Sequence, residues 1–192
     1  YSAVSVMDML REALPLTVEA KGKDVISQSE AMYVNLLAAG LQSSEGKPVR
    51  EYVDAAMKAA AKMLAAANSD GGFAWFEGMK SSPIVTAVVL ERFAGLRDRK
   101  LLNVVSDELG EDALDAFDEA VVSAVRYMDS VYFGDPDRPV WYGCISLWQY
   151  LNVRSMYVGL PFDEQAARKA IGTKGYNEFR KTVKSYLVPK KG

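Results

Sequence analysis

Histidine is absent from the sequence, and this absence removes most of the chemistry that side chains can perform. The 192 residues contain no histidine and a single cysteine, Cys144. Ser-His-Asp and Cys-His catalysis, His-ligated zinc and imidazole acid–base steps all require histidine. One cysteine also leaves no partner for an internal disulfide and no cysteine-rich metal site. We therefore expect no catalytic residues, no metal site and no cofactor in this chain.

Only carboxylate, Lys, Tyr or Ser chemistry is left to consider, and one acidic cluster has suitable spacing. Glu111 and Asp115 share a helical face, and Asp118 and Glu119 extend it. Such a cluster could hold Mg²⁺ and a diphosphate. Acidic residues in a first helical turn are also stabilised by the helix dipole. We interpret this cluster as a solvated helix start.

A second set of candidates lies in two loops that are rich in glycine and aromatic residues. The first loop is Asp70-Gly71-Gly72-Phe73-Ala74-Trp75-Phe76, and the second runs from Tyr132 to Gly143. Paired glycines permit positive φ, whereas large rings between packed helices are usually buried. We interpret the first loop as an aromatic plug that locks adjacent helical hairpins together, with a ligand-pocket lining as the alternative. The candidate contact or packing cluster is Phe73, Trp75, Phe76, Trp141, Tyr142 and Trp148.

The first loop also leaves a catalytic alternative open. Asp70, Glu77 and Glu91 lie around it, and a pair of such carboxylates could act as a glycosidase. In that case Trp75, Trp141 and Trp148 would stack on a sugar or on an apolar ligand. The separation of the carboxyl groups decides this alternative, and sequence spacing does not give it.

Helices must position these residues, because apolar side chains recur at intervals of three and four residues almost everywhere. Ser27 to Glu30 has the spacing of a capping box, and Ser82-Pro83 supplies an N-cap followed by an N1 proline. We expect an all-α domain. Its helices are predicted at residues 3–14, 27–42, 52–67, 83–95, 111–128, 144–158 and 176–187, with short elements at 100–108 and 163–170. The helix that begins at 83 ends either at Gly95 or in the basic cluster at 97–99.

Composition and charge narrow the class of protein further. The 23 basic and 25 acidic residues are mixed along the chain, so no single-sign field would attract nucleic acid. The longest apolar stretches, such as 84–90, are far shorter than the roughly 20 residues that span a bilayer. The chain begins at Tyr1 without an initiator Met or an export signal. We expect one domain, 1–192, that is a fragment of a larger multidomain protein.

Two segments carry a resemblance to a known family. The first is Asp70 to Phe76 with the stretch from Ser82 to Leu90, and the second is Leu147-Trp148-Gln149-Tyr150-Leu151-Asn152-Val153-Arg154-Ser155. In this order they resemble the helical thioester-type domain of bacterial α2-macroglobulins. The resemblance implies an α/α toroid of helical hairpins, partial or complete. Terpene cyclases and protein prenyltransferases share that toroid and have similar loops.

The resemblance implies a non-catalytic domain of a protease-trapping protein, that is, a protease inhibitor of the periplasm or the extracellular space. Its partners would be neighbouring domains of the parent chain and proteases. Some family members carry a Cys-x-Glu-Gln thioester, but Cys144-Ile145-Ser146-Leu147 has Leu where Gln is needed. We therefore interpret Cys144 as a buried structural thiol. The alternative is a toroid enzyme or ligand-binding module, resembling terpene cyclases or prenyltransferases or acting on glycans, that uses the aromatic loops.

Overall fold

The computed structural model describes residues 17–133 and 145–187, and the regular structure of these residues is helical. The helices are α2 (Val25–Ser44), α3 (Arg50–Leu64), α4 (Pro83–Asp98), α5 (Leu102–Leu109), the 3-10 helix η1 (Glu111–Leu114), α6 (Asp115–Phe133), α7 (Leu147–Ser155) and α8 (Glu164–Leu187). Apart from two isolated β-bridges, the described ranges contain no strand. The expected all-α class is confirmed. The helix predicted at 3–14 lies outside the described residues.

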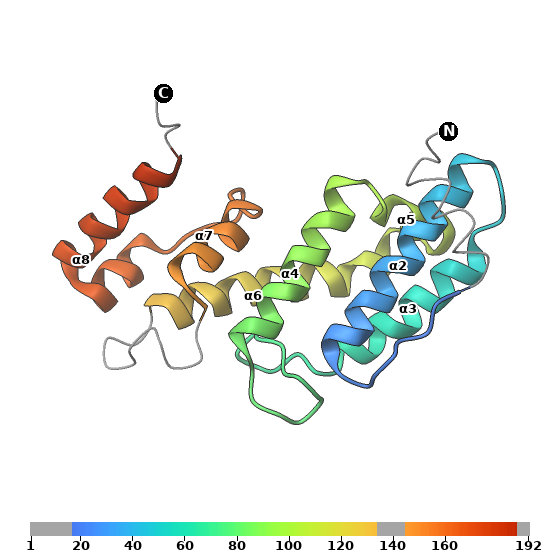
Figure 1. The fold of residues 1–192 in the computed structure, drawn as a ribbon, viewed down its shortest axis with the longest axis horizontal. Helices are drawn as coiled ribbons and strands as arrows, with labels where there is room; N and C mark the ends of the chain where they lie inside the picture. The colour runs from blue at the N-terminus through green and yellow to red at the C-terminus, as the bar shows by residue number, and fades with distance from the viewer. Residues whose placement is uncertain (1–16, 134–144, 188–192) are drawn as a thin grey trace, which may run out of the picture.

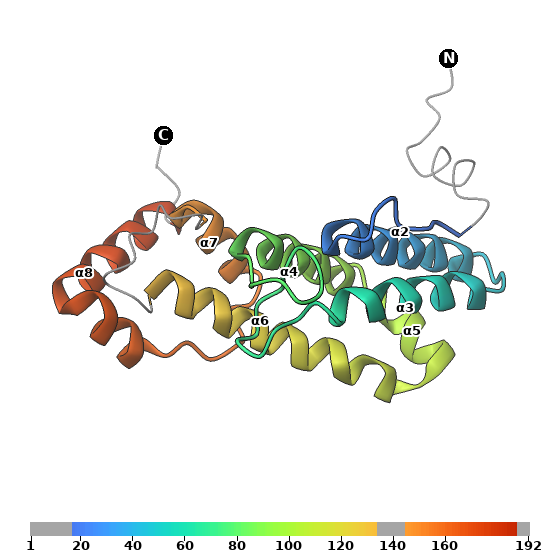
Figure 2. The same ribbon diagram turned by 90° about the horizontal axis from the view of Figure 1, so that it is seen from below.

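Successive long helices alternate between two layers. Helices α2, α4 and α7 lie in one layer, and α3 and α6 lie in the other (Figure 2). Helix α2 packs against α3 and α4, whereas α4 also packs against α6 and α7. The short helices α5 and η1 join α4 to α6, and α8 packs against α6 at one end of the elongated molecule (Figure 1). The fold is therefore an array of helices in two layers.

Helix α4 is the central element of this array because it is apolar around most of its circumference. It buries eight residues, namely Val85, Thr86, Ala87, Val89, Leu90, Phe93, Ala94 and Leu96. A helix with buried residues on most sides must be surrounded by other elements, and α2, α6 and α7 surround α4. None of the described helices combines the length and the apolar sequence that crossing a bilayer requires.

Side-chain caps confirm the predicted start of one helix and correct the predicted start of another. The predicted N-cap at Ser82 is confirmed, since its hydroxyl accepts a hydrogen bond from the Val85 N–H. The predicted capping box at 27–30 is wrong, because α2 begins at Val25 and Asp24 is its N-cap. The Asp24 carboxylate accepts from the backbone and the hydroxyl of Ser27, and these bonds lower the pKa of Asp24. A carboxylate satisfies the first-turn N–H groups and also interacts favourably with the helix dipole.

Two other boundaries differ from the prediction for identifiable reasons. Helix α3 ends at Leu64 rather than Ala67, because the backbone of 66–67 pairs with the loop that follows: Ala67 forms a bridge with Phe73, and the Ala74 N–H donates to the Ala66 carbonyl at 3.1 Å. The two elements predicted at 163–170 and 176–187 are joined in α8. Gly172 divides that helix with φ 72° and ψ 161°, a conformation that favours glycine.

We predict that α4 controls the stability of the whole array. Leu90 is fully buried, so Leu90→Ala should lower the free energy of unfolding by about 2–5 kcal/mol. Ile84 lies on the same helix and is 46% exposed, so Ile84→Ala should change it by less than about 1 kcal/mol. Urea unfolding followed by circular dichroism measures both values. Equal losses for the two variants would show that α4 is not packed as described.

Candidate functional site

The loop between α3 and α4 is held in one conformation by side-chain hydrogen bonds. The Asp70 carboxylate accepts from the Gly72 N–H at 3.0 Å and from the Ser81 hydroxyl at 2.6 Å. The Asn68 side-chain amide donates to the Ser81 hydroxyl and to the Met79 carbonyl, both at 2.9 Å. Residues eleven and thirteen positions apart are thus tied together across the loop. These bonds make the loop a preformed surface.

Phe73 anchors this loop in the core. Its ring is buried, and its N–H donates to the Thr86 hydroxyl on α4 at 2.9 Å. The Phe73 carbonyl accepts from the Ser82 N–H at 2.8 Å. On the opposite side, the Trp75 carbonyl accepts from the Val25 N–H at the start of α2 at 2.9 Å. The loop is therefore attached to both α2 and α4.

The two glycines of the loop are required by the close approach of α6 and, for Gly72, also by Ser81 of the loop itself, whose Cβ would lie 2.6 Å from an added Cβ. Gly71 has φ +86°, and a Cβ placed there would lie 2.4 Å from the Ser123 carbonyl oxygen on α6. A Cβ on Gly72 would lie 2.7 Å from Cζ of Tyr127, one helical turn further along. Real Cβ atoms do not come so close to other heavy atoms. Gly71 has the positive φ that the sequence predicts for this loop, whereas Gly72 is needed because a side chain at this position would clash with its neighbours.

The structure corrects the prediction that all three rings of this loop form a buried plug. Phe73 is buried as expected, but Trp75 and Phe76 are 40% and 47% exposed. Met79 and Ile84, which the sequence did not single out, are 49% and 46% exposed. We call these four residues on the loop and the first turn of α4 the loop surface. A rigid loop that keeps four large apolar side chains partly in water has the composition of a contact surface.

Two of the carboxylates considered for catalysis, Asp70 and Glu91, have structural partners. Asp70 holds the loop, and the Glu91 carboxylate accepts from the Asn152 side chain at 3.1 Å. Glu77 is exposed on the loop. Glu111 lies in η1 and Asp115 begins α6. Among the residues that the structure describes, no three His, Cys, Asp or Glu side chains are grouped as a metal site would require.

The second aromatic loop is covered only at its start. Trp141, Tyr142 and Cys144 lie outside the described ranges. Tyr132 and Phe133 at the end of α6 belong to an aromatic cluster that the sequence did not identify. The Tyr132 ring stacks on Tyr150 of α7 with centroids 4.4 Å apart, and the Phe133 ring meets Tyr150, Phe162 and Phe179 edge to face. This cluster joins α6, α7 and α8.

Trp148, the last member of the predicted cluster, is 60% exposed on α7. It lines a groove together with the apolar residues Leu151, Val158 and Val183 and the polar residues Asn152, Arg154 and Ser155, and no carboxylate is among the lining residues. The structure therefore places Trp148 on a different element from Phe73, Trp75 and Phe76. Helix α7 begins with a capping box formed by Ser146 and Gln149. The pair matches the sequence pattern of such a box and was a signal available from the sequence alone.

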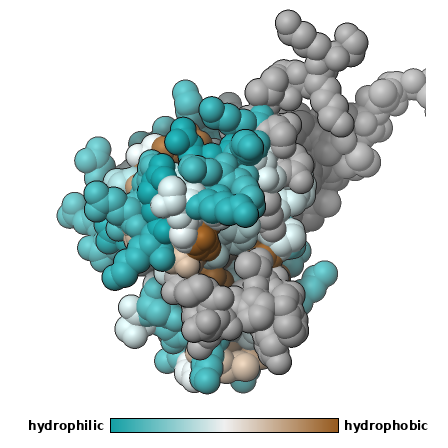
Figure 3. Space-filling model, turned by 90° about the vertical axis from the view of Figure 1, so that its left-hand side faces the viewer, coloured by the Kyte–Doolittle hydropathy of each residue, from teal (hydrophilic) through white to brown (hydrophobic). Residues whose placement is uncertain are grey.

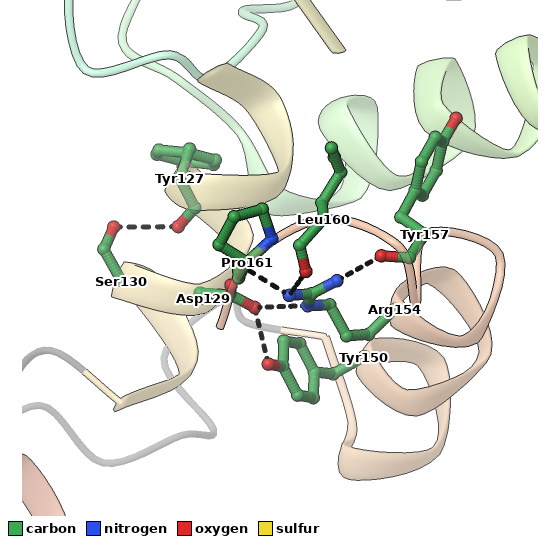
Figure 4. Close-up of polar contacts among 8 residues, drawn as sticks. All are labelled: Tyr127, Asp129, Ser130, Tyr150, Arg154, Tyr157, Leu160 and Pro161. Carbon is green, nitrogen blue, oxygen red and sulfur yellow. Dashed lines mark hydrogen bonds and ion pairs between the residues drawn. The ribbon is translucent and has the colours of Figure 1, made fainter. Parts of the chain in front are cut away.

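An ion pair between two partly buried side chains connects α6 to α7 at this groove. Nε of Arg154 lies 3.2 Å from Oδ1 of Asp129, and the Tyr150 hydroxyl donates to the same oxygen at 2.6 Å (Figure 4). The Arg154 Nη2 group donates to the carbonyls of Leu160 and Pro161 at 2.9 and 3.0 Å, and Nη1 donates to that of Tyr157. Nε itself has no aligned hydrogen bond, so its contact with Asp129 is electrostatic.

Burial raises the pKa of Asp129, although the Tyr150 hydroxyl and the Arg154 charge lower it in part. Burial and the Asp129 charge also raise the pKa of Tyr150, so its hydroxyl remains a donor at all ordinary pH values. The three groups form one polar network, in which Nε of Arg154 is held to Asp129 by charge alone. Such networks fix the geometry of the elements that carry them, and here they fix α7 on α6.

We predict that a methyl group at Gly71 destabilises the loop through its clash with α6. Gly78 is a matched control because it has φ +81° but no atom near its missing Cβ. Both Gly71→Ala and Gly78→Ala add the strain of a positive φ, about 1–3 kcal/mol. Only Gly71→Ala adds overpacking, which costs roughly 1–3 kcal/mol more. Chemical denaturation of both variants measures this difference, and identical losses would contradict the close approach of the loop to α6.

We predict that removing the hydroxyl of Tyr150 destabilises the fold more than removing the hydroxyl of Tyr157, although both hydroxyls donate hydrogen bonds from buried side chains. Tyr150→Phe removes a hydrogen bond to a charged acceptor and should cost about 1.5–3 kcal/mol. Tyr157→Phe removes the hydroxyl bond to the neutral Leu90 carbonyl and should cost about 0.5–1.5 kcal/mol. Denaturation of each variant against the unmodified chain gives the two values. The reverse order would contradict an ionised Asp129 in the folded state.

The stabilising effect of the hydrogen bond between Tyr150 and Asp129 depends on pH. Because the pKa of Asp129 is raised above its ordinary value of 3.8, its own contribution to stability falls as the pH rises from 3.8 through the pKa of the folded state. Tyr150→Phe raises that pKa further. The loss of unfolding free energy caused by Tyr150→Phe should therefore be greatest above the pKa that Asp129 has in the folded state. This loss should become smaller as the pH falls below that pKa. The cost of Tyr157→Phe should not follow this titration.

Comparison of the chain with protein-family models, with curated proteins and with solved structures finds no match.

Proposed function

We propose that this chain is a non-catalytic helical domain of a bacterial α2-macroglobulin-like protease-trapping protein. The single observation that supports the proposal best is the contact between the two segments that resemble that family. The first segment includes the aromatic loop and the first half of α4, and the second is α7. The two helices pack against each other. Two stretches separated by more than fifty residues therefore belong to one structural unit.

Specific hydrogen bonds hold this unit together. The Tyr157 hydroxyl, just after α7, donates to the Leu90 carbonyl of α4 at 2.6 Å in a buried position. Next to it, the Asn152 side chain donates to Glu91 at 3.1 Å. A buried carbonyl that accepts from another element fixes the relative position of both helices. Leu90 and Asn152 belong to the two segments that carry the resemblance, and Glu91 and Tyr157 lie just beyond the ends of those segments.

The alternation of helices between two layers supports the finer proposal of an α/α toroid. In such a toroid, successive helices alternate between an inner and an outer ring. We assign α2, α4 and α7 to one ring and α3 and α6 to the other, since these sets form the two layers of the array (Figure 2). The described helices would then be an arc of the toroid.

The loop surface gives this domain its proposed role. Trp75, Phe76, Met79 and Ile84 are partly exposed, and the hydrogen bonds of the loop fix their backbone in advance. A preformed apolar surface binds without a large ordering cost. We assign it to contact with a neighbouring domain of the parent protein, in the periplasm or the extracellular space. The domain would support the capture of a protease by shape and contact rather than by chemistry.

The proposal is tested by incubating the full-length protein with an active protease. Trapping should suppress cleavage of a large protein substrate while cleavage of a small peptide substrate continues, because the protease is enclosed and not blocked at its active site. If the full-length protein leaves the rate of cleavage of the large substrate unchanged, as it does that of the small peptide, the proposal is overturned.

Phe76 and Phe73 form a matched pair that separates contact from stability. Phe73 is buried, so Phe73→Ala should lower the free energy of unfolding by about 3–5 kcal/mol. Phe76 is 47% exposed, so Phe76→Ala should lower it by less than half that amount, about 25 cal/mol for each Å² of buried ring that is lost. In the full-length protein, Phe76→Ala should nevertheless weaken trapping. Glu77→Ala is the neighbouring exposed control and should leave trapping unchanged; if Phe76→Ala also leaves trapping unchanged, the loop surface has no such role.

A further inference from the structure

A second apolar surface lies at the α8 end of the molecule and is independent of the loop surface. Two adjoining hollows of about 390 and 300 Å³ share Leu151, Arg154, Val158 and Val183, so they form one groove between α7 and α8, the α7–α8 groove. Seen from this end, the surface is mostly hydrophilic, and hydrophobic atoms are visible in a hollow near its centre (Figure 3). Such volumes are within the range of real binding sites.

The groove exposes large apolar side chains. Val158 is 82% exposed and Trp148 is 60% exposed, and Phe179 and Val183 of α8 line the opposite wall. Each Å² of apolar surface removed from water is worth about 25 cal/mol. Covering these side chains would therefore contribute substantially to binding, and Trp is the residue type that contributes most often at binding interfaces.

The floor of the groove is preorganised. Arg154 lines both hollows, and its guanidinium holds the carbonyls of Leu160 and Pro161 at 2.9 and 3.0 Å. The chain that carries Val158 is thereby fixed between α7 and α8. Asp129 balances the Arg154 charge from below, so Arg154 contributes shape rather than a free charge. A ligand would meet an already formed groove.

The rim of the groove has one sign of charge. Arg180 and Lys184, one helical turn apart on α8, line it, and no Asp or Glu is among the lining residues of either hollow. Over its whole length, α8 contains six basic residues, namely Arg168, Lys169, Lys174, Arg180, Lys181 and Lys184, but only Glu164 and Glu178 as acidic ones. An apolar groove with a basic rim is complementary to a segment with apolar and acidic side chains.

We propose that the α7–α8 groove binds an acidic amphipathic helix of a protein partner. Helix α7 has nine residues, about 13 Å of helix, so a partner of two to three turns spans the groove. Its apolar face would cover Trp148, Leu151 and Val158, and its carboxylates would lie beside Arg180 and Lys184. The concave shape between two helices favours an inserted helix over a flat membrane surface. This proposal does not depend on the proposed function of the loop surface.

Fluorescence anisotropy with a defined probe tests the proposal. The probe is a labelled peptide of about 18 residues, roughly 27 Å as a helix, with Leu along one face and Glu and Ala elsewhere. A second peptide replaces each Glu by Lys. At about 0.15 M salt, where charges are screened beyond about 8 Å, the Glu peptide should bind the 192-residue chain at least about tenfold more tightly than the Lys peptide.

Variants at exposed positions locate the binding. Arg180→Glu with Lys184→Glu should weaken binding of the Glu peptide at least about tenfold and strengthen binding of the Lys peptide. Lys58→Glu with Lys62→Glu on α3 has the same spacing and the same change in charge, and should leave both affinities unchanged. Val158→Ser should weaken the binding of both peptides, because it removes part of the apolar surface of the groove. Circular dichroism confirms that each variant is folded.

Three results would overturn the proposal. The chain could bind the two peptides with equal affinity, or the two double variants could lose equal affinity for the Glu peptide. The third result is that vesicles of phosphatidylcholine and phosphatidylserine displace the Glu peptide from the chain. The last result would identify the groove as a membrane-contact surface. The trapping assay is unaffected by all three, so the two proposals fail separately.

Discussion

Burial of α4 between the two layers is the constraint on which the rest of the structure depends. The helix can be surrounded only if its first turn is satisfied without water. The Ser82 hydroxyl caps that turn, and Thr86 both donates to the Ser82 carbonyl and accepts from the Phe73 N–H. Since Thr86 is fully buried, loss of either partner would leave a polar group unpaired in the core. The aromatic loop is thus a structural part of α4.

Helix α6 relates the two exposed surfaces to this core. Its residues Ser123 and Tyr127 approach the glycines of the aromatic loop, and Asp129 pairs with Tyr150 and Arg154 of α7. The loop and the α7–α8 groove are therefore positioned by adjacent turns of one helix. Both surfaces combine a polar network beneath with apolar side chains above. This combination supplies rigid contact surfaces in a chain whose described residues contain no grouped metal ligands.

Local signals in the sequence predicted the helical class and part of the loop, but not every helix boundary. Apolar periodicity predicted the all-α class, and the N-cap at Ser82 and the buried ring of Phe73 agree with the structure. The start of α2 was misplaced because Asp24 competes successfully with the capping pattern that follows it. The end of α3 was misplaced because pairing of the backbone at 66–67 with the loop is a tertiary effect. Propensity does not report such effects.

The functional surfaces were harder to predict because exposure depends on how helices pack. Trp75 and Phe76 are as aromatic as Phe73, yet only Phe73 points into the core. Met79 and Ile84 have no distinguishing sequence signal. The partnership of Asp129 with Arg154 spans 25 positions and requires α7 to lie on α6. Basic residues predominate in α8, but the sequence alone does not show that Arg180 and Lys184 lie beside an apolar groove.

Photocrosslinking in the full-length protein tests most directly whether the domain works by contact through the loop surface. Phe76 is replaced by p-benzoylphenylalanine, and Asp107, which is exposed on α5, is replaced in the same way as a control. The account predicts a crosslink from position 76 to another domain of the parent chain, with little or none from position 107. No crosslink from position 76, or the same crosslinks from both positions, would contradict it.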